Sequence, residues 1–280
     1  MKSILLPTDF SKSSINAINY AVKLFEGISC NFYILNVQKA SSFISDDLMT
    51  VSSSATIYST LVDAAKKSIA NIISDIEKHS KNKKHTFHSL VDYDNFIDAI
   101  NQTSKIYGID LIVMGTNGAS GLEKVIFGTN TVHVMQRCSV PVLAIPDGCK
   151  FKKLDKIGFT SSFSSDYFVD DFKVLIDIAS FYKSKVQILH VVEENDFEEK
   201  LAENIDFFNT NFPQVIYERI YSKGGDSYSD IHEYAVKNQI KMIAMVGKSN
   251  SFLCRLFARL AVETFAIKID IPFLVLHRVQ

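Results

Sequence analysis

Cysteine is scarce in this chain, and the few cysteines form no pattern. Cys30, Cys138, Cys149 and Cys254 are the four cysteines among 280 residues, and no two of them make a Cys-x-x-Cys pair. Scattered cysteines of this kind are typical of buried or incidental thiols in a reducing compartment. The spacing therefore argues against a disulfide framework and against a structural zinc site.

An excess of basic charge is also missing. Lys and Arg total 30 against 31 Asp and Glu, and neither half carries the basic surplus of a non-specific nucleic-acid binder. No apolar run approaches the roughly 20 residues that span a bilayer, and residues 1–7 lack the core and the cleavage site of a signal peptide. We therefore expect a cytoplasmic protein that binds neither membranes nor nucleic acids.

The motifs of several enzyme classes are not found. The sequence has no Gly-x4-Gly-Lys-Ser/Thr loop, so it lacks the phosphate-clamping lysine of P-loop NTPases. It has neither a nucleophile elbow nor a kinase signature. These absences argue against the three enzyme arrangements that the motifs define.

What the sequence does contain is a regular alternation of strand-like and helix-like segments. Apolar residues make up 47% and charged residues 22%, as in folded globular proteins, and the length suits two domains. The alternation predicts a parallel sheet with crossover helices. In the first half we expect strands at 3–6, 31–37, 83–91, 111–114 and 141–146, helices at 11–25, 57–76, 95–104 and 131–137, and a polar loop at 40–56.

The second half repeats the first after a linker-like stretch at residues 146–153. Residues 157–164 line up with 4–11, and two later strands repeat in the same order. Duplication explains this order better than chance. The sequence therefore predicts an α/β protein of two tandem doubly wound domains, each with a five-stranded parallel sheet, at residues 1–148 and 152–280.

The most informative stretch is a glycine-rich loop between an apolar strand and a helix. Its glycines are Gly115, Gly118 and Gly128, and Thr129 and Thr131 follow at the start of the helix. Backbone N–H groups and the positive end of a helix, presented together, suit a phosphate. Gly128 leaves room for that phosphate, although glycines at this spacing also serve loops that bind nothing. The loop is a candidate triphosphate cradle.

Four groups of residues together resemble the universal stress protein family, in its tandem form and on its ATP-binding side. They run through the first half from end to end, at residues 7–11, 110–118, 128–129 and 141–143. The resemblance implies an adenine nucleotide alpha hydrolase-like fold and ATP binding. Asn117 departs from the histidine that the family more often has, a change that need not affect the phosphates.

The resemblance also assigns positions around the ligand. Pro7, Thr8 and Asp9 would lie beside the adenosine, and Val37 against the adenine. The residues implied around the ribose and phosphates are Met114, Gly115, Gly118, Gly128, Thr129, Asn130 and Thr131. Mg²⁺ or Mn²⁺ would bridge the phosphates. For Asp9 the alternative is a helix N-cap, and for Lys124 a solvated lysine competes with a phosphate contact.

The leading interpretation is a regulator that is not an enzyme. ATP would order the polar loop after the second strand and change a surface that a protein partner recognises. No additional acid or base stands out in the glycine-rich loop to activate water. A slow ATPase or a nucleotidyl-transfer relative is one alternative, and a ligand-free dimerisation scaffold is another. A homo-oligomer and the identity of the partner stay open.

The second half keeps the pattern of the fold without the cradle. Thr-Ser-Ser at 160–162 removes the carboxylate of Asp9. After the fourth strand only the first glycine persists, as Gly247, and Arg259 takes the place of Gly128. A long side chain there would fill the space of a phosphate. We therefore expect that the second half does not bind ATP in the same way.

The last strands of the two halves should pair with each other. Single-domain proteins of the family pair these edges between subunits, and an exposed apolar edge is a liability. Tandem fusion would cover both edges, at residues 141–145 and 272–276, within one chain.

Overall fold

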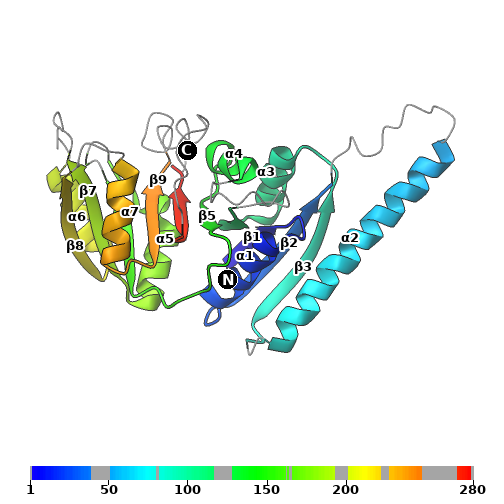
Figure 1. Cartoon of the computed structure of the whole chain (residues 1–280), viewed down its shortest axis with the longest axis horizontal. Coiled ribbons are helices and arrows are strands. Elements are labelled where there is room, and N and C mark those ends of the chain that lie inside the picture. The colour runs from blue at the N-terminus through cyan, green and yellow to red at the C-terminus, as the bar shows by residue number, and fades with distance from the viewer. Residues whose placement is uncertain are drawn as a thin grey trace.

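A computed structural model (Figure 1) describes the chain at residues 2–38, 51–79, 82–116, 128–161, 163, 166–192, 201–221, 227–247 and 270–278. Residues 40–50 of the predicted polar loop lie outside this part. Residues 51–56, also predicted as loop, belong to a long helix instead. Once the apolar face farther along has fixed that helix, extending it through another turn costs little.

Ten strands form one sheet in the order β3-β2-β1-β4-β5-β10-β9-β6-β7-β8. Within each half every neighbouring pair is parallel, and the two halves have the same strand order. The first half contains β1 (Lys2–Pro7), β2 (Cys30–Val37), β3 (His85–Asp92), β4 (Leu111–Gly115) and β5 (Val142–Ile145). The second contains β6 (Lys156–Thr160), β7 (Lys185–Val192), β8 (Gln214–Tyr221), β9 (Met242–Val246) and β10 (Phe273–Leu276). The predicted fold class is confirmed.

Helices cover both faces of the sheet, as crossovers between parallel strands require. Four pack on one face: α1 (Lys12–Leu24), α2 (Val51–His79), α5 (Val169–Tyr182) and α6 (Leu201–Asn211). On the other face lie α3 (Phe96–Tyr107), α4 (Thr129–Arg137) and α7 (Ser227–Lys237). Side chains alternate between the two cores, so Ile4 and Leu6 face the first group and Leu5 the second. In Figure 1 the first turns of α2 extend beyond the sheet.

The two halves join through their last strands. β5 and β10 pair antiparallel, with Leu143 opposite Leu274 at the centre. Every side chain of both strands is buried, so each half covers the apolar edge of the other. The predicted pairing of the last strands is confirmed, while the domain boundaries at 148 and 152 stay a prediction.

Helices α1 and α5 pack against each other across the same seam. The Tyr182 hydroxyl, at the end of α5, donates to the Leu24 carbonyl of α1 at 2.6 Å. A Cβ on Gly27 would lie 2.5 Å from the Phe181 ring, so only glycine allows this approach without a shift of the ring. One hydrophobic core therefore runs through both halves.

Strand register fixes which residues of the two halves are equivalent. β4 meets β1 where Leu111 pairs with Ile4, and β9 meets β6 where Met242 pairs with Ile157. At the far end, the residue that follows each of β4 and β9 donates its N–H to the last residue of β5 or β10. Each residue of β4 thus has a defined counterpart in β9.

This equivalence corrects the alignment predicted for Gly247. Gly247 follows β9 as Thr116 follows β4, and Val246 takes the place of Gly115. An alignment that matches Gly247 with Gly115 is therefore shifted by one residue from the hydrogen-bond register. Hydrogen-bond register, which the sequence does not display, decides the match, so the second half lacks the first glycine of the loop as well.

Candidate functional site

The candidate site lies where the strand order of the first half reverses. β1 pairs with β2 on one side and with β4 on the other, and the crossover helices leave toward opposite faces. Open α/β sheets bind ligands in the crevice at the carboxyl ends of the strands beside such a switch point. The strands end there at Pro7, Val37 and Gly115, three of the predicted ligand residues.

Thr8 organises the turn that follows β1. It is 6% exposed, and its hydroxyl lies 2.9 Å from the Ser14 Oγ and accepts the Phe10 N–H at 3.0 Å. The Asn36 amide donates to the Thr8 carbonyl at 2.8 Å, which ties the end of β2 to this turn. Phe10 has a φ of 63°, a left-handed conformation that costs a non-glycine residue roughly 1–2 kcal/mol. The Thr8 hydroxyl helps to hold it there.

Asp9 follows Thr8 at the surface. One carboxylate oxygen accepts the Ser11 N–H at 3.0 Å. The N-cap of α1 is Ser11, whose hydroxyl accepts the Ser14 N–H at 3.2 Å. The capping alternative for Asp9 is therefore wrong, because Ser11 already has that role.

Gly115 marks the closest approach between α1 and β4. A Cβ at this position would lie 2.5 Å from the Ser13 Oγ and 2.8 Å from the Ser13 carbonyl oxygen. Backbone cannot retreat from such a contact as a flexible side chain would. Gly115 thus allows the first turn of α1 to reach the end of β4.

The start of α4 completes the site. Gly128 is its N-cap and offers no side-chain cap, while its own N–H donates to the Thr116 carbonyl. The Thr131 hydroxyl donates to the Gly115 carbonyl at 2.9 Å, so that hydrogen is used within the protein. Thr129 and Asn130 are exposed. The positive end of the α4 dipole therefore lies at the end of β4.

Two buried hydroxyl groups at this place lack a hydrogen-bond partner within the described part of the chain. They are the Ser13 Oγ, on the first turn of α1, and the Thr116 Oγ1, directly after β4. Both residues are almost fully buried, and buried polar groups are normally hydrogen-bonded. Neither hydroxyl was predicted from the sequence, although a hydroxyl residue directly after Gly115 was a visible signal.

The remaining predicted residues divide into two groups. Val37 is half-buried at the end of β2, and Met114 is buried in β4. Gly118, together with Asn117 and Lys124, lies outside the described residues. The structure thus brings the ends of β1, β2 and β4 to the start of α4, while the middle of the glycine-rich loop is not described.

A family model with the description "Universal stress protein family" matches residues 1–146. The chain belongs to the universal stress protein family. Universal stress protein MJ0531 of Methanocaldococcus jannaschii is 25% identical over 144 residues, which are 51% of this chain and 81% of that protein. The family model covers the half that holds the candidate site.

Among solved structures, a universal stress protein from Archaeoglobus fulgidus covers 99% of this chain and 98% of its own, at 17% identity and a TM-score of 0.68. The universal stress protein fold therefore extends over both halves. Another matching structure is a universal stress protein in complex with cAMP, at 18% identity, 52% of this chain, 98% of that chain and a TM-score of 0.36.

The second half repeats the backbone of the universal stress protein site. The Ser161 Oγ accepts the Phe163 N–H at 3.1 Å, as the Thr8 hydroxyl does for Phe10. Phe163 is also left-handed, with a φ of 51°. His190 lies with its Nδ1 2.9 Å from the Ser161 carbonyl oxygen, at the place of the amide that holds Thr8.

The side chains around this second turn differ from those of the first. Tyr167 places its hydroxyl 2.8 Å from the Ser161 Oγ, where the first half has a serine from α1. The ring of Phe163 is buried and lies 5.0 Å from the ring of His190. Tyr167 and His190 therefore bring aromatic rings to places where the first half has Ser14 and Asn36.

The helix after β6 also begins later. Val169, the first residue of α5, follows Ser161 by eight positions, whereas Lys12 follows Thr8 by four. Val246, in the place of Gly115, has a side chain where α1 meets the strand so closely. The first turn of α5 therefore does not repeat the contact that α1 makes at the candidate site.

Two other kinds of site are missing from the described part of the chain. None of its helices has the length and apolar character to cross a membrane, and no three of its His, Cys, Asp or Glu side chains are grouped as metal ligands.

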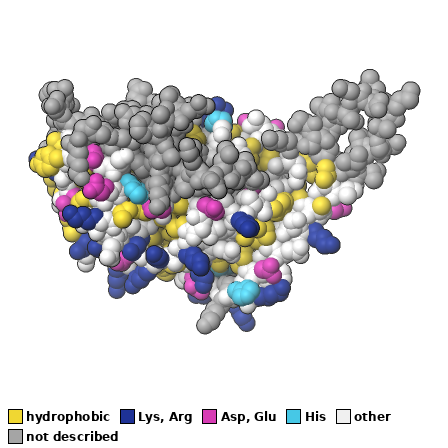
Figure 2. Space-filling model, viewed as in Figure 1, with side chains coloured by type: hydrophobic (Ala, Val, Ile, Leu, Met, Phe, Trp, Pro, Cys, Tyr) yellow, Lys and Arg dark blue, Asp and Glu magenta, His cyan; other side chains and the backbone are white. Residues whose placement is uncertain are grey.

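Burial raises the pKa of Cys30 to about 11 and that of Cys138 to about 12, so both remain thiols. On the face of the molecule drawn in Figure 2, acidic and basic side chains are mixed, and Lys and Arg are concentrated along its lower edge.

Proposed function

We propose that this universal stress protein is a cytoplasmic regulator that binds one ATP, with Mg²⁺ or Mn²⁺ on the phosphates, at the candidate site of its first half. One observation carries the proposal: at the switch point of the sheet, the buried Thr116 hydroxyl has no partner among the described residues and lies beside the start of α4, which has no side-chain cap. Such a place offers hydrogen bonds and positive potential to an anion.

The residues at this place fit a nucleotide in their chemistry. The N–H groups at the start of α4 and the hydroxyls of Thr116 and Thr129 suit phosphates. Gly128 leaves the approach to the helix open, and Asp9 stands at the surface above β1, within the reach of a ribose hydroxyl as the family resemblance implies. Thr131 would act by fixing the Gly115 carbonyl and not by contacting the phosphates.

Gly128→Val tests the proposal directly. The added side chain would occupy the phosphate space, and the loss of one or two charged hydrogen bonds should weaken ATP binding by more than about tenfold. Calorimetry with ATP and Mg²⁺ measures the affinity, and near-ultraviolet circular dichroism of the variant controls for its fold. Unchanged affinity in a folded variant would sink the assignment.

A regulator and an enzyme differ in turnover. A cradle without a positioned base binds ATP without lowering the barrier to hydrolysis, so we expect phosphate release far slower than the ~10 per second of a typical enzyme. A continuous phosphate assay on the chain loaded with ATP decides between them. Release at enzyme-like rates would favour the ATPase alternative.

Regulation would pass through the segment that follows β2. Gln38, the last residue described before it, donates to the Asn36 side chain at 2.6 Å, and Asn36 in turn donates to the Thr8 carbonyl. A ligand beside Thr8 would therefore touch the residues from which this segment starts. Proteolysis of residues 39–50 with and without ATP tests the idea, because an ordered segment is cut more slowly.

A further inference from the structure

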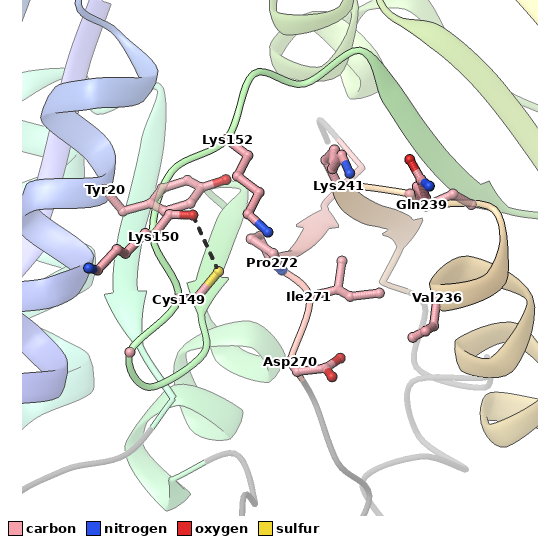
Figure 3. Close-up of a pocket in the computed structure, with 12 residues that line it drawn as sticks. Tyr20, Cys149, Lys150, Lys152, Val236, Gln239, Lys241, Asp270, Ile271 and Pro272 are labelled. Carbon is pink, nitrogen blue, oxygen red and sulfur yellow. Dashed lines mark hydrogen bonds between the residues drawn. The ribbon is translucent and has the colours of Figure 1, made fainter.

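A cleft separate from the strand ends opens at the seam between the two halves (Figure 3). Its volume is about 510 Å³, within the range of roughly 300–1,000 Å³ that small-molecule sites occupy. One wall is the connection from β5 to β6 at residues 148–152, backed by Tyr20 of α1. The opposite wall consists of residues 236–241, between α7 and β9, and residues 270–272, before β10.

The wall made by the connection is held in place. The Asn16 amide of α1 donates to the Cys149 carbonyl at 3.0 Å, and the Cys149 N–H donates to the Pro146 carbonyl at 3.1 Å. Phe151 packs edge-on against Tyr20, with ring centres 5.4 Å apart. This wall is therefore part of the folded core.

The cleft carries unpaired positive charge. Lys152 reaches from the connection toward the far wall, where Lys241 lies (Figure 3). Neither amino group makes a hydrogen bond or an ion pair within the described residues. Asp270, the acid among the lining residues, has a carboxylate oxygen 2.7 Å from the His232 Nε2. Two lysine charges thus face one space without a protein partner in the part of the chain that the structure describes.

The rest of the lining adds a neutral donor and an apolar surface. Burial raises the pKa of Tyr20 far above its ordinary value, with smaller contributions from Cys149 and Tyr182, so its hydroxyl keeps its proton. Ile271 and Pro272 line the wall opposite the connection. A ligand here would meet positive charge at one side and apolar atoms at the other.

The residue of the first half that is equivalent to Lys241 borders a much smaller cavity. Between Asp110 and α5 only about 20 Å³ remains. Asp110 is the counterpart of Lys241, as Gly108 and Gln239 before them share a left-handed backbone. The Asp110 carboxylate accepts the Ser3 N–H at 2.8 Å, so it serves the protein. The cavity beside Asp110 therefore offers neither the volume nor the free lysine charge of the cleft.

We propose that this cleft is a second binding site, for a small molecule that carries a phosphate group and an apolar body. Lys152 and Lys241 hold the phosphate as point charges, and the apolar body lies against Ile271 and Pro272. The proposal is independent of ATP binding in the first half.

Alkylation of Cys149 can measure whether a ligand occupies this cleft. Its thiol is half-exposed and lines the same wall as Lys152, whereas Cys30 and Cys138 are buried. The experiment measures the rate of Cys149 alkylation by iodoacetamide on the full chain, read at the Cys149 peptide by mass spectrometry. Phenyl phosphate is the probe. Inorganic phosphate, which has no apolar group, is the comparison ligand, and sodium chloride is the control for ionic strength.

We expect saturable protection of Cys149, with half-protection by phenyl phosphate at a severalfold lower concentration than by inorganic phosphate. Lys152→Gln and Lys241→Gln should each raise that concentration by about tenfold, while Lys105→Gln, on the exposed end of α3, leaves it unchanged. Since Lys152 lowers the pKa of Cys149 against the raising effect of burial, each variant is compared with itself without ligand.

Absence of protection by both phosphates, or protection that survives the Lys152→Gln/Lys241→Gln double variant, would overturn the site. Equal protection by the two phosphates would overturn the apolar half of the proposal and leave an anion site. An ATP-site variant such as Gly128→Val should not change the protection, which separates this proposal from the first.

Discussion

The two halves place nearly the same backbone at their strand ends and surround it with different side chains. In the first half, Thr8 bonds to a serine of α1, and Gly115 lets that helix approach. In the second half, Ser161 bonds to Tyr167, and Val246 stands where glycine would be needed. The same turn thus meets a serine hydroxyl of α1 in one half and aromatic side chains in the other.

The comparison teaches that a duplicated fold keeps its hydrogen-bonded frame more strictly than its ligand site. The left-handed phenylalanine after the first strand occurs in both halves, and so does the hydroxyl that accepts its N–H. These contacts hold the chain reversal and are needed whatever the half binds. The close approach at the glycine and the early helix start occur only in the first half.

ATP binding by the second half would contradict this comparison most strongly. We expect one ATP per chain and no saturable binding by residues 152–280, a difference of at least about a thousandfold in affinity, or ~4 kcal/mol. Calorimetry on the full chain gives the stoichiometry. The full-length Gly128→Val variant is the control: any ATP that it still binds would be bound by the second half, within the intact sheet.

Binding of a second ATP, or binding by residues 152–280 as tight as that of the first half, would contradict the prediction that the second half does not bind ATP. Val246 and Tyr167 would then not be the side chains that separate a binding half from a closed one.

The next largest effect concerns the glycine that lets α1 approach. Gly115→Val should lower the free energy of unfolding by about 3 kcal/mol, because the new side chain meets the Ser13 backbone. Val246→Ala, the matched change in β9, should cost only about 1 kcal/mol, the value of the lost methyl groups at a half-buried position. Urea unfolding measures both.

A loss for Gly115→Val no larger than that for Val246→Ala would mean that α1 does not approach β4 closely enough to exclude a side chain at position 115. That outcome would contradict the difference in helix position on which the comparison depends.

The smallest effects are expected from the two equivalent hydroxyl groups. Thr8→Ala and Ser161→Ala each leave a phenylalanine N–H without its acceptor, so each should lower the free energy of unfolding by about 1–2 kcal/mol. Only Thr8→Ala should also weaken ATP binding. Thermal melts and calorimetry on the same samples separate the two effects, and a loss of ATP affinity in Ser161→Ala would show that the second turn takes part in binding.

Much of this molecule could be predicted from the sequence because its signals are local. Apolar runs with helical spacing between them indicated the strands and helices to within a few residues, and repeated strands indicated the duplication. The loop predicted at 51–56 was wrong because a hydroxyl-rich composition suggests a break, whereas a long helix continues through these residues.

The candidate site was predicted only in part for a different reason. The glycines and threonines of the loop were visible as a motif, but Ser13 gains its meaning from a contact with Gly115, about a hundred positions away. The one-residue shift at Gly247 depends on hydrogen bonds that the sequence does not show. The cleft at Lys152 and Lys241 joins segments that are distant in the chain.

The sequence by itself determined the α/β alternation, the duplication and the presence of one glycine-rich loop, since each is written in the order of neighbouring residues. Only the tertiary structure decided that β5 and β10 pair antiparallel with Leu143 opposite Leu274, that Tyr167 stands in the second half where Ser14 stands in the first, and that a basic cleft opens at the seam. The physical reason is that pairing, packing and the meeting of charges depend on distances in space, which the fold sets after the local elements have formed.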